Sequence, residues 1–209
     1  METINSKSSL AVVLSRLNGF SSPKLLLEQY ETESEVAAST LWHAYMKGWI
    51  EGKIVADLGA GTGILGIGCL LLGAKKCFFL EKDIEAVSIL KENLSELNLL
   101  NRTLIIRKDI SLIKRDEFPE PAELVVQNPP FGTKIKSSDR AFIAKACELS
   151  SRIISFHKSS TADFVKQAFK SLGFEVAEIL NFRYPLKSTY SFHKSRRKEI
   201  LVSSFFFYR

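Results

Sequence analysis

Two kinds of hydrophobic pattern alternate along most of the chain. Short apolar runs rich in β-branched residues alternate with longer stretches whose apolar residues recur every three or four positions. The first pattern is typical of buried strands and the second of amphipathic helices. The predicted strands are Lys53–Asp57, Cys77–Glu81, Thr103–Arg107, Leu124–Asn128 and Ile153–Phe156. The helices predicted among them are Ile64–Leu72, Ile84–Leu97, Ala141–Leu149 and Thr161–Leu172.

The two ends of the chain depart from this alternation. Residues 1–52 favour helices at Ser9–Leu17, Pro23–Tyr30 and Ser34–Trp49. At the other end, Phe174–Phe182 and Ile200–Tyr208 are longer, aromatic segments that predict an antiparallel pair joined by a basic loop. We therefore expect an α/β, Rossmann-like fold with a mostly parallel seven-stranded sheet, an antiparallel last strand and helices on both faces.

Length and composition fit a single domain of 209 residues, with an N-terminal helical segment (1–52) and a Rossmann-like core (53–209). The longest apolar run, from Ile64 to Leu72, is too short to cross a bilayer, and the start of the chain lacks the basic region of a signal peptide. Three cysteines form no CxxC pair. These features predict a cytoplasmic protein that has no metal site and does not contact the membrane.

The chain has a formal net charge of +6 and a pI near 9.2, a balance that modestly favours polyanionic partners. The distribution of the positive charges along the chain is more informative than their number. Cations cluster between Lys187 and Lys198, with Tyr190 and Phe192 among them. Cations can contact phosphates and aromatic rings can stack on unpaired bases, so RNA is one interpretation. A solvated hairpin tip explains the same cluster equally well.

A glycine-rich loop follows the first predicted strand. Asp57 ends that strand, and Gly59, Gly61 and Gly63 follow in a G-x-G-x-G spacing that also includes Thr62. This spacing differs from the G-x-G-x-x-G of dinucleotide binders. With an acid directly ahead, it resembles motif I of class I methyltransferases, whose cofactor is S-adenosylmethionine. NAD binding or a purely structural turn are the alternatives, since one glycine-rich turn is weak support by itself.

Acids at the next two strand ends strengthen the cofactor interpretation. Glu81 follows Asp57 by 24 positions, close to the offset of about 20 at which an acid accepts from ribose hydroxyls. Asp83 is an alternative acceptor, but the strand phase favours Glu81. Asp109, just past the third strand, is placed to accept from an adenine amino group, with Ile110 beside the ring.

The fourth predicted strand ends in Asn128-Pro129-Pro130-Phe131. Two prolines stop a strand and stiffen the turn after it. The Asn128 side-chain oxygen and the Pro129 carbonyl could accept from both N–H groups of an exocyclic amine, and Phe131 could stack on its base. The motif class occurs in enzymes that methylate adenine N6, cytosine N4, guanine N2 and glutamine N5. A plain strand-terminating loop is the alternative, but it leaves the asparagine and the aromatic residue unexplained.

Beyond these motifs, the chain resembles the methyltransferase-like 5 family of ribosomal RNA adenine-N6 methyltransferases. The resemblance is carried by Gly19-Phe20, Pro23–Thr32, Val55–Gly59, Asn128–Lys134, His157–Thr161 and Tyr190–Lys194. It implies that Gln29 and Thr32 contact the cofactor and that the substrate is RNA, in rRNA or a ribosomal subunit. It also implies a small zinc-binding activator protein as a partner of some members, at the edge of the third strand. Glu81 stands where the family usually has aspartate.

Three alternatives stay open at this point. A protein-glutamine N5 methyltransferase shares the tetrapeptide, although such enzymes usually carry tyrosine after the prolines. A catalytically silent RNA-binding subunit would share the fold, but the intact Asn128–Phe131 stretch argues against it. His157 could contact a substrate phosphate or be a structural histidine, and we do not count it among the catalytic residues.

Overall fold

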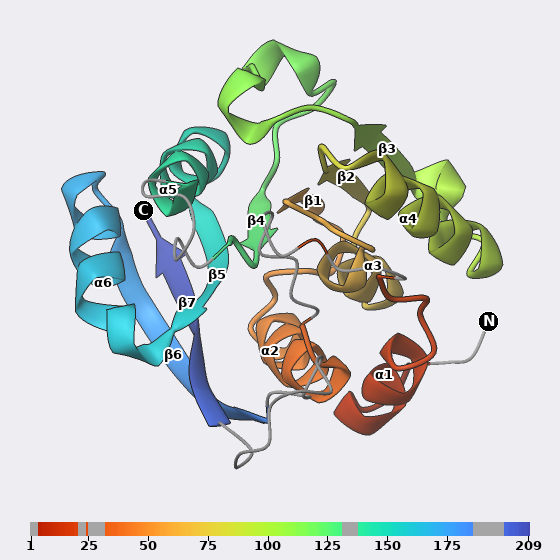
Figure 1. The fold of residues 1–209 in the computed structure, drawn as a ribbon, viewed down its shortest axis with the longest axis horizontal. Coiled ribbons are helices and arrows are strands. Elements are labelled where there is room, and N and C mark those ends of the chain that lie inside the picture. Colours follow the sequence, from red (N-terminus) through yellow and green to blue (C-terminus); the bar gives the residue numbers. More distant parts are fainter. Residues whose placement is uncertain (1–3, 21–23, 25–31, 131–137, 186–198) are drawn as a thin grey trace.

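The computed structural model describes residues 4–20, 24, 32–130, 138–185 and 199–209 and contains a seven-stranded sheet (Figure 1). The strands lie in the order β3-β2-β1-β4-β5-β7-β6. Their bounds are β1 Ile54–Leu58, β2 Lys76–Leu80, β3 Thr103–Ile106, β4 Leu124–Gln127, β5 Arg152–Lys158, β6 Glu175–Pro185 and β7 Glu199–Tyr208. Strands β1 to β5 pair in parallel, and β7 is antiparallel to both neighbours. The predicted fold class is confirmed.

Helices cover both faces of the sheet (Figure 1). They are α1 Lys7–Leu14, α2 Ser34–Met46, α3 Ile64–Leu71, α4 Ile84–Glu96, α5 Ser138–Leu149 and α6 Ala162–Ser171. One buried cluster packs the four helices α1, α2, α3 and α4 against one face of the sheet, through residues such as Leu41 and Leu90. A second cluster joins α5 and α6 to the other face, through residues such as Ile143 and Phe169. Within the described residues, none of the helices has the length and apolar character that crossing a membrane requires.

Several element boundaries differ from the predicted ones for local reasons. Helix α1 begins at Lys7 rather than Ser9, because Ser6 caps it and exchanges hydrogen bonds with Ser9. Helix α2 ends at Met46 rather than Trp49, because Gly48 takes a positive φ of 69°. The predicted helix at Pro23–Tyr30, apart from Lys24, and the basic loop of 187–198 lie outside the described residues.

The strand register brings the carboxyl ends of four strands together. Leu58 of β1 pairs with Leu80 of β2 and with Gln127 of β4, while Leu80 pairs with Ile106 of β3. Strand order reverses at β1, because β2 lies on one side of it and β4 on the other. In open α/β sheets, ligands bind outside the carboxyl ends of the strands at such a reversal. The residues that follow these four strands are therefore the place to look for a site.

Candidate active site

The glycine-rich loop connects β1 to α3, and its conformation requires glycine. Gly59, Gly61 and Gly63 have φ values of 68°, 55° and 97°, which side chains rarely adopt. A Cβ on Gly63 would also lie 2.3 Å from a methyl carbon of Leu90. A Cβ on Gly61 would lie 3.0 Å from the nearest carbon of the Phe20 ring. The positive φ values and the close packing of neighbouring side chains therefore both favour glycine at these positions.

Asp57, the last acid of β1, holds the start of α3. Its Oδ2 accepts a 2.8 Å hydrogen bond from the Gly66 N–H, and only 1% of the residue is exposed. Burial, opposed by that bond, raises the pKa of Asp57 to about 7. The carboxyl group is therefore poised between its neutral and charged forms near neutral pH. A cation bound next to it would favour the charged form.

Glu81, directly after β2, folds back onto the glycine loop. Its Oε2 accepts from the Gly61 N–H at 2.8 Å, and its Oε1 accepts from the Lys82 and Asp83 N–H groups at 2.8 and 2.9 Å. Three backbone donors thus fix a half-buried carboxylate beside the bend. Because a carboxylate has about four acceptor sites, Glu81 can still accept from a ligand hydroxyl.

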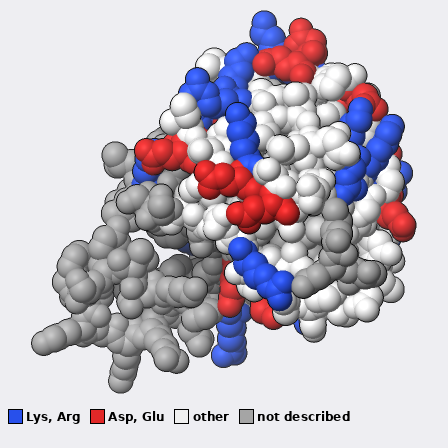
Figure 2. Space-filling model, turned by 90° about the vertical axis from the view of Figure 1, so that its right-hand side faces the viewer, with Lys and Arg blue, Asp and Glu red and all other residues white. Residues whose placement is uncertain are grey.

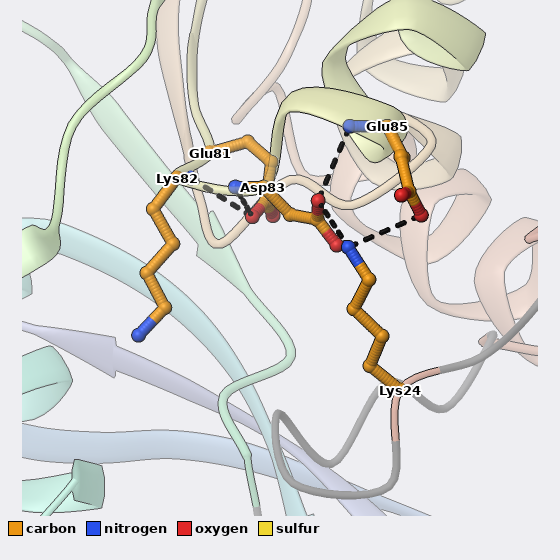
Figure 3. A network of polar contacts seen from close by, with 5 residues as sticks. All are labelled: Lys24, Glu81, Lys82, Asp83 and Glu85. Atoms are coloured by element: carbon orange, nitrogen blue, oxygen red, sulfur yellow. Dashed lines mark hydrogen bonds and ion pairs between the residues drawn. The ribbon is translucent and has the colours of Figure 1, made fainter.

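Asp83, the alternative ribose acceptor, has a structural task instead. It caps α4 by accepting from the Glu85 N–H, and it pairs with Lys24 at 2.8 Å (Figure 3). Lys24 also pairs with Glu85 at 3.1 Å, while the Lys82 side chain extends away from this network. The Asp83 side chain is buried, with 4% exposed. Lys24 therefore ties the N-terminal part of the chain to the helix that follows β2.

Asp109 lies past β3 as predicted, but its oxygens already have partners. Oδ1 accepts from the Ser111 hydroxyl and N–H, and Oδ2 pairs with the Lys82 ammonium at 3.1 Å. These contacts, the Ser111 hydroxyl first, lower the pKa of Asp109. Ile110 is half-buried in the short 3-10 turn Ile110–Leu112. An adenine amino group that donates a hydrogen bond to the Asp109 carboxylate would be a third donor beside Ser111 and Lys82.

The Asn128 turn follows β4, and one side of its amide has a partner. Asn128 Nδ2 donates to the Thr32 hydroxyl at 2.9 Å, whereas Oδ1 is buried and has no hydrogen-bond partner among the described residues. Pro129 is buried and Pro130 half-buried. Phe131 and the predicted cofactor contact Gln29 lie outside the described residues. An unpaired buried oxygen at the end of a strand suits an incoming N–H donor.

Sequence reasoning missed Asn93, which braces the glycine loop. Its side chain is fully buried on α4. Nδ2 donates at 3.0 Å to the carbonyls of Asn18 and Thr62, and Oδ1 accepts from the Asn18 N–H at 2.8 Å. The sequence held one signal, an amide on the apolar side of a helix between Leu90 and Leu94. Asn93 thus fastens the N-terminal part of the chain to the loop that carries Thr62.

His157 belongs to a buried polar chain on the α5–α6 side. Gln127 Nε2 donates to the Ser155 hydroxyl at 2.9 Å, and that hydroxyl contacts His157 Nε2 at 2.6 Å. Burial lowers the pKa of His157 to about 3, so the ring is uncharged at neutral pH. Only 3% of the residue is exposed, and both the Ser155 hydroxyl and the Phe205 ring contact its imidazole. The structural interpretation of His157 is the better one.

Charge on one face of the molecule is mixed rather than segregated, as far as the described residues show. On the face shown in Figure 2, lysine and arginine side chains are interspersed with aspartate and glutamate. Ion pairs also join oppositely charged side chains of the described residues, as between Lys53 and Glu123 and between Lys108 and Glu117. The part of this face that the structure describes therefore offers no extended basic area.

The sheet order, the glycine bend after β1 and the asparagine turn after β4 define a class I methyltransferase. Residues 34–172 match the protein family described as Conserved hypothetical protein 95. The chain is 35% identical over 192 residues to the rRNA N(6)-adenosine-methyltransferase Mettl5 of Drosophila melanogaster, covering 90% of each. It is 34% identical to the protein named METTL5 of Danio rerio, covering 90% of this chain and 92% of that one. The chain belongs to the methyltransferase-like 5 family.

A solved structure supports the same placement. The crystal structure of a Pyrococcus horikoshii protein, described as a candidate RNA methyltransferase, superposes with a TM-score of 0.86. It is 40% identical in sequence, and the match covers 99% of this chain and 98% of that one. The likeness therefore includes the N-terminal helices as well as the sheet.

Proposed function

We propose that this protein transfers a methyl group from S-adenosylmethionine to the exocyclic N6 of adenine in structured RNA. The two relatives described above are named as rRNA N(6)-adenosine-methyltransferases. The observation that carries the proposal is the Asn128 side chain, whose Oδ1 is buried and has no hydrogen-bond partner in the described part of the chain, next to the point where strand order reverses.

Two acceptors at the Asn128 turn would hold the amine. The adenine amino group is a weak nucleophile because its lone pair is delocalised into the ring. Asn128 Oδ1 and the Pro129 carbonyl accept from its two N–H groups, which favours a pyramidal nitrogen with its lone pair free. Phe131 would stack on the extruded base. The residues then contribute by orienting the amine, so positioning supplies most of the rate.

The residues around the glycine bend fit S-adenosylmethionine. Bound there, the cofactor supplies an electrophilic methyl group. Glu81 would accept from its ribose hydroxyls and Asp109 from its adenine amino group, with Ile110 against the ring. Asp57 would face its cationic amino end, and the loop backbone at Gly59, Gly61 and Gly63, which lack a Cβ, would allow close approach. Gln29 would add a contact from the N-terminal part of the chain.

The RNA assignment draws on charge as well as on the relatives. Residues 187–198 include Lys187, Lys194, Arg196, Arg197 and Lys198 and no acid, so they hold most of the net charge that could neutralise phosphates. We propose that this segment contacts RNA and that residues 1–209 act as one catalytic domain. A zinc-binding activator partner and a cytoplasmic location remain predictions.

The test combines a substrate panel with one variant. Wild type and Asn128→Ala would be given labelled S-adenosylmethionine with small-subunit rRNA and, separately, with a glutamine-containing release factor. We expect N6-methyladenosine in digested rRNA, seen by nucleoside mass spectrometry, and no label on the protein. Loss of a positioned acceptor should slow Asn128→Ala by about 100-fold or more. Asn101→Ala is the matched control, because Asn101 is exposed and far along the chain from the turn.

Each outcome decides between the candidates. Label on glutamine rather than on RNA would support the protein methyltransferase instead. Absence of label on either substrate, with RNA still bound, would support the silent RNA-binding subunit. Equal rates for Asn128→Ala and wild type would remove the catalytic assignment of the turn.

A further inference from the structure

The first turns of α5 and α6 bring a cation onto an aromatic ring. The guanidinium carbon of Arg140 lies 5.9 Å from the centroid of the Phe164 ring, within the range of a cation–π contact. Arg140 is exposed, and 43% of Phe164 is exposed, whereas Val165 and Phe169 of the same helix are buried. Two planar groups that can stack on another ring therefore lie together at the surface.

This pair lies at the edge of the sheet that carries the candidate active site. Strands β4 and β5 are parallel neighbours, so Asn128 after β4 and the start of α6 after β5 lie at the same edge. Helix α5 starts there as well, because the Phe142 ring lies so near the glycine bend that a Cβ on Gly59 would stand 2.9 Å from it. Figure 1 shows α5 and α6 side by side beyond β4. The pair is therefore part of the rim of the site, on the side of β5.

The charges beside this pair balance one another. The first five residues of each helix hold one acid and one cation, since Asp139 precedes Arg140 in α5 and Asp163 precedes Lys166 in α6. Asp163 and Lys166 pair at 2.8 Å, and Asp139 is half-buried. The helix starts thus offer no surplus of charge to a row of phosphates. A partner with a free planar face fits them better than one that offers only charge.

We propose that Arg140 and Phe164 form a stacking platform for an unpaired base of the RNA substrate, next to the target adenine. The proposal rests on the proposed function, and it names the part of the RNA that this surface takes. When an adenine is extruded into a site, its neighbours in the strand lose a stacking partner. The Phe164 ring or the guanidinium plane replaces that partner. A base inside a duplex has both faces covered and cannot use the platform.

Binding of short RNAs by the full chain tests the platform. Fluorescence anisotropy would give the Kd for a single-stranded oligoadenosine of about 12 nucleotides and for an RNA duplex of the same length. We expect Phe164→Leu to raise the Kd for the single strand by about 5- to 50-fold, because a base loses its aromatic partner. The Kd for the duplex should change by less than about twofold. Phe164→Trp keeps a π face and should bind the single strand at least as tightly as wild type.

Tyr208→Leu is the matched control. Tyr208 is an aromatic residue with a similar exposed fraction, 42%, and it pairs with Arg152 at the start of β5, at the opposite edge of the sheet. Its substitution should leave the Kd for the single strand within about twofold of wild type. A Phe164→Leu protein that binds the single strand as tightly as this control would overturn the inference. So would an equal loss of affinity for the duplex, which would indicate a contact that needs no free base.

Kinetics on rRNA test whether the platform lies next to the target adenine. Phe164→Leu should raise the KM for rRNA by about the same factor as the Kd for the single strand, with kcat within about twofold of wild type. Arg140→Gln should raise the same KM by about 3- to 10-fold, because it removes the second planar group. The Kd for S-adenosylmethionine, measured by calorimetry, should not change in either variant. An unchanged KM for rRNA in Phe164→Leu would overturn the placement of the platform beside the target.

The two proposals fail in different ways. If wild type transfers no methyl group to RNA, the proposed function fails and this inference falls with it. If wild type methylates RNA while Phe164→Leu has the Kd and KM of wild type, only the platform is wrong. Should Phe164→Leu melt at a lower temperature than wild type, Arg140→Gln of normal melting temperature decides the question by the same two measurements.

Discussion

Glu81 Oε2 accepts a 2.8 Å hydrogen bond from the Gly61 N–H, so the acid after β2 is tied to the bend after β1. Its other oxygen accepts from two further N–H groups, those of Lys82 and Asp83. A carboxylate held by backbone donors loses little conformational freedom when a ligand binds, which favours affinity. The bend and its acid are therefore one preorganised unit.

The first prediction concerns Glu81→Gln. An amide has one acceptor oxygen instead of two, so it cannot serve both Gly61 and the Lys82–Asp83 turn while also accepting from a ribose. We expect the Kd for S-adenosylmethionine to rise about 10- to 100-fold by calorimetry, with a small loss of stability. Glu85→Gln is the matched control, because Glu85 belongs to the neighbouring network and its side chain is 62% exposed. Equal affinity of Glu81→Gln and wild type would remove Glu81 from the cofactor site.

The second prediction concerns Asn93→Leu. Leucine fills a similar volume but leaves the carbonyls of Asn18 and Thr62 and the Asn18 N–H without their buried partner. Urea denaturation should show a loss of about 2–4 kcal/mol in the free energy of unfolding. Glu92→Gln, exposed on the same helix, should change it by less than about 0.5 kcal/mol. A loss no larger than that of the control would mean that Asn93 does not brace the loop.

The third prediction concerns Asp57 and pH. Its pKa of about 7 in the free protein should fall when a cationic cofactor binds beside it, so binding releases a proton. A group whose pKa falls on binding makes affinity rise with pH up to the free pKa. We expect about tenfold tighter binding of S-adenosylmethionine at pH 8 than at pH 6. Calorimetry in two buffers of different ionisation enthalpy would measure the released proton directly. No proton release near pH 6.5 would contradict a cofactor contact at Asp57.

Much of the fold followed from the alternation of strand and helix patterns, because that pattern depends on local periodicity. The antiparallel β6–β7 pair was also predicted, since its aromatic segments are longer than those of the parallel strands. The helix ends were less accurate. Ser6 caps α1 through its contact with Ser9, and Gly48 stops α2 before Trp49. Such caps depend on single side chains and conformations that a periodic pattern does not contain.

In the site, the residues at strand ends could be predicted, but contacts between residues far apart in the sequence could not. Asp57 lies near the end of β1, and Glu81, Asp109 and Asn128 lie past the ends of β2, β3 and β4, because each of these strands has a recognisable apolar pattern. The bonds from Thr32 to Asn128 and from Asn93 to Asn18 join positions 96 and 75 residues apart. Packing of the N-terminal helices sets those contacts. The amide of Asn93 on an apolar helix side indicates a buried polar contact, but the sequence does not indicate its partner.

The last prediction concerns His157 and acid stability. Its pKa is about 3 in the folded protein and about 6.5 in an unfolded chain. Between pH 6.5 and pH 3, His157 therefore binds a proton in the unfolded state but not in the folded state. The folded state therefore loses stability as pH falls from 6.5 toward 3. Relative to His157→Gln, wild type should lose about 2 kcal/mol of unfolding free energy between pH 7 and pH 5. At pH 8 both side chains are uncharged, so the difference there reports packing alone. A difference that stays constant from pH 8 to pH 5 would show that His157 takes up its proton in the folded protein, as an exposed histidine with a phosphate contact would.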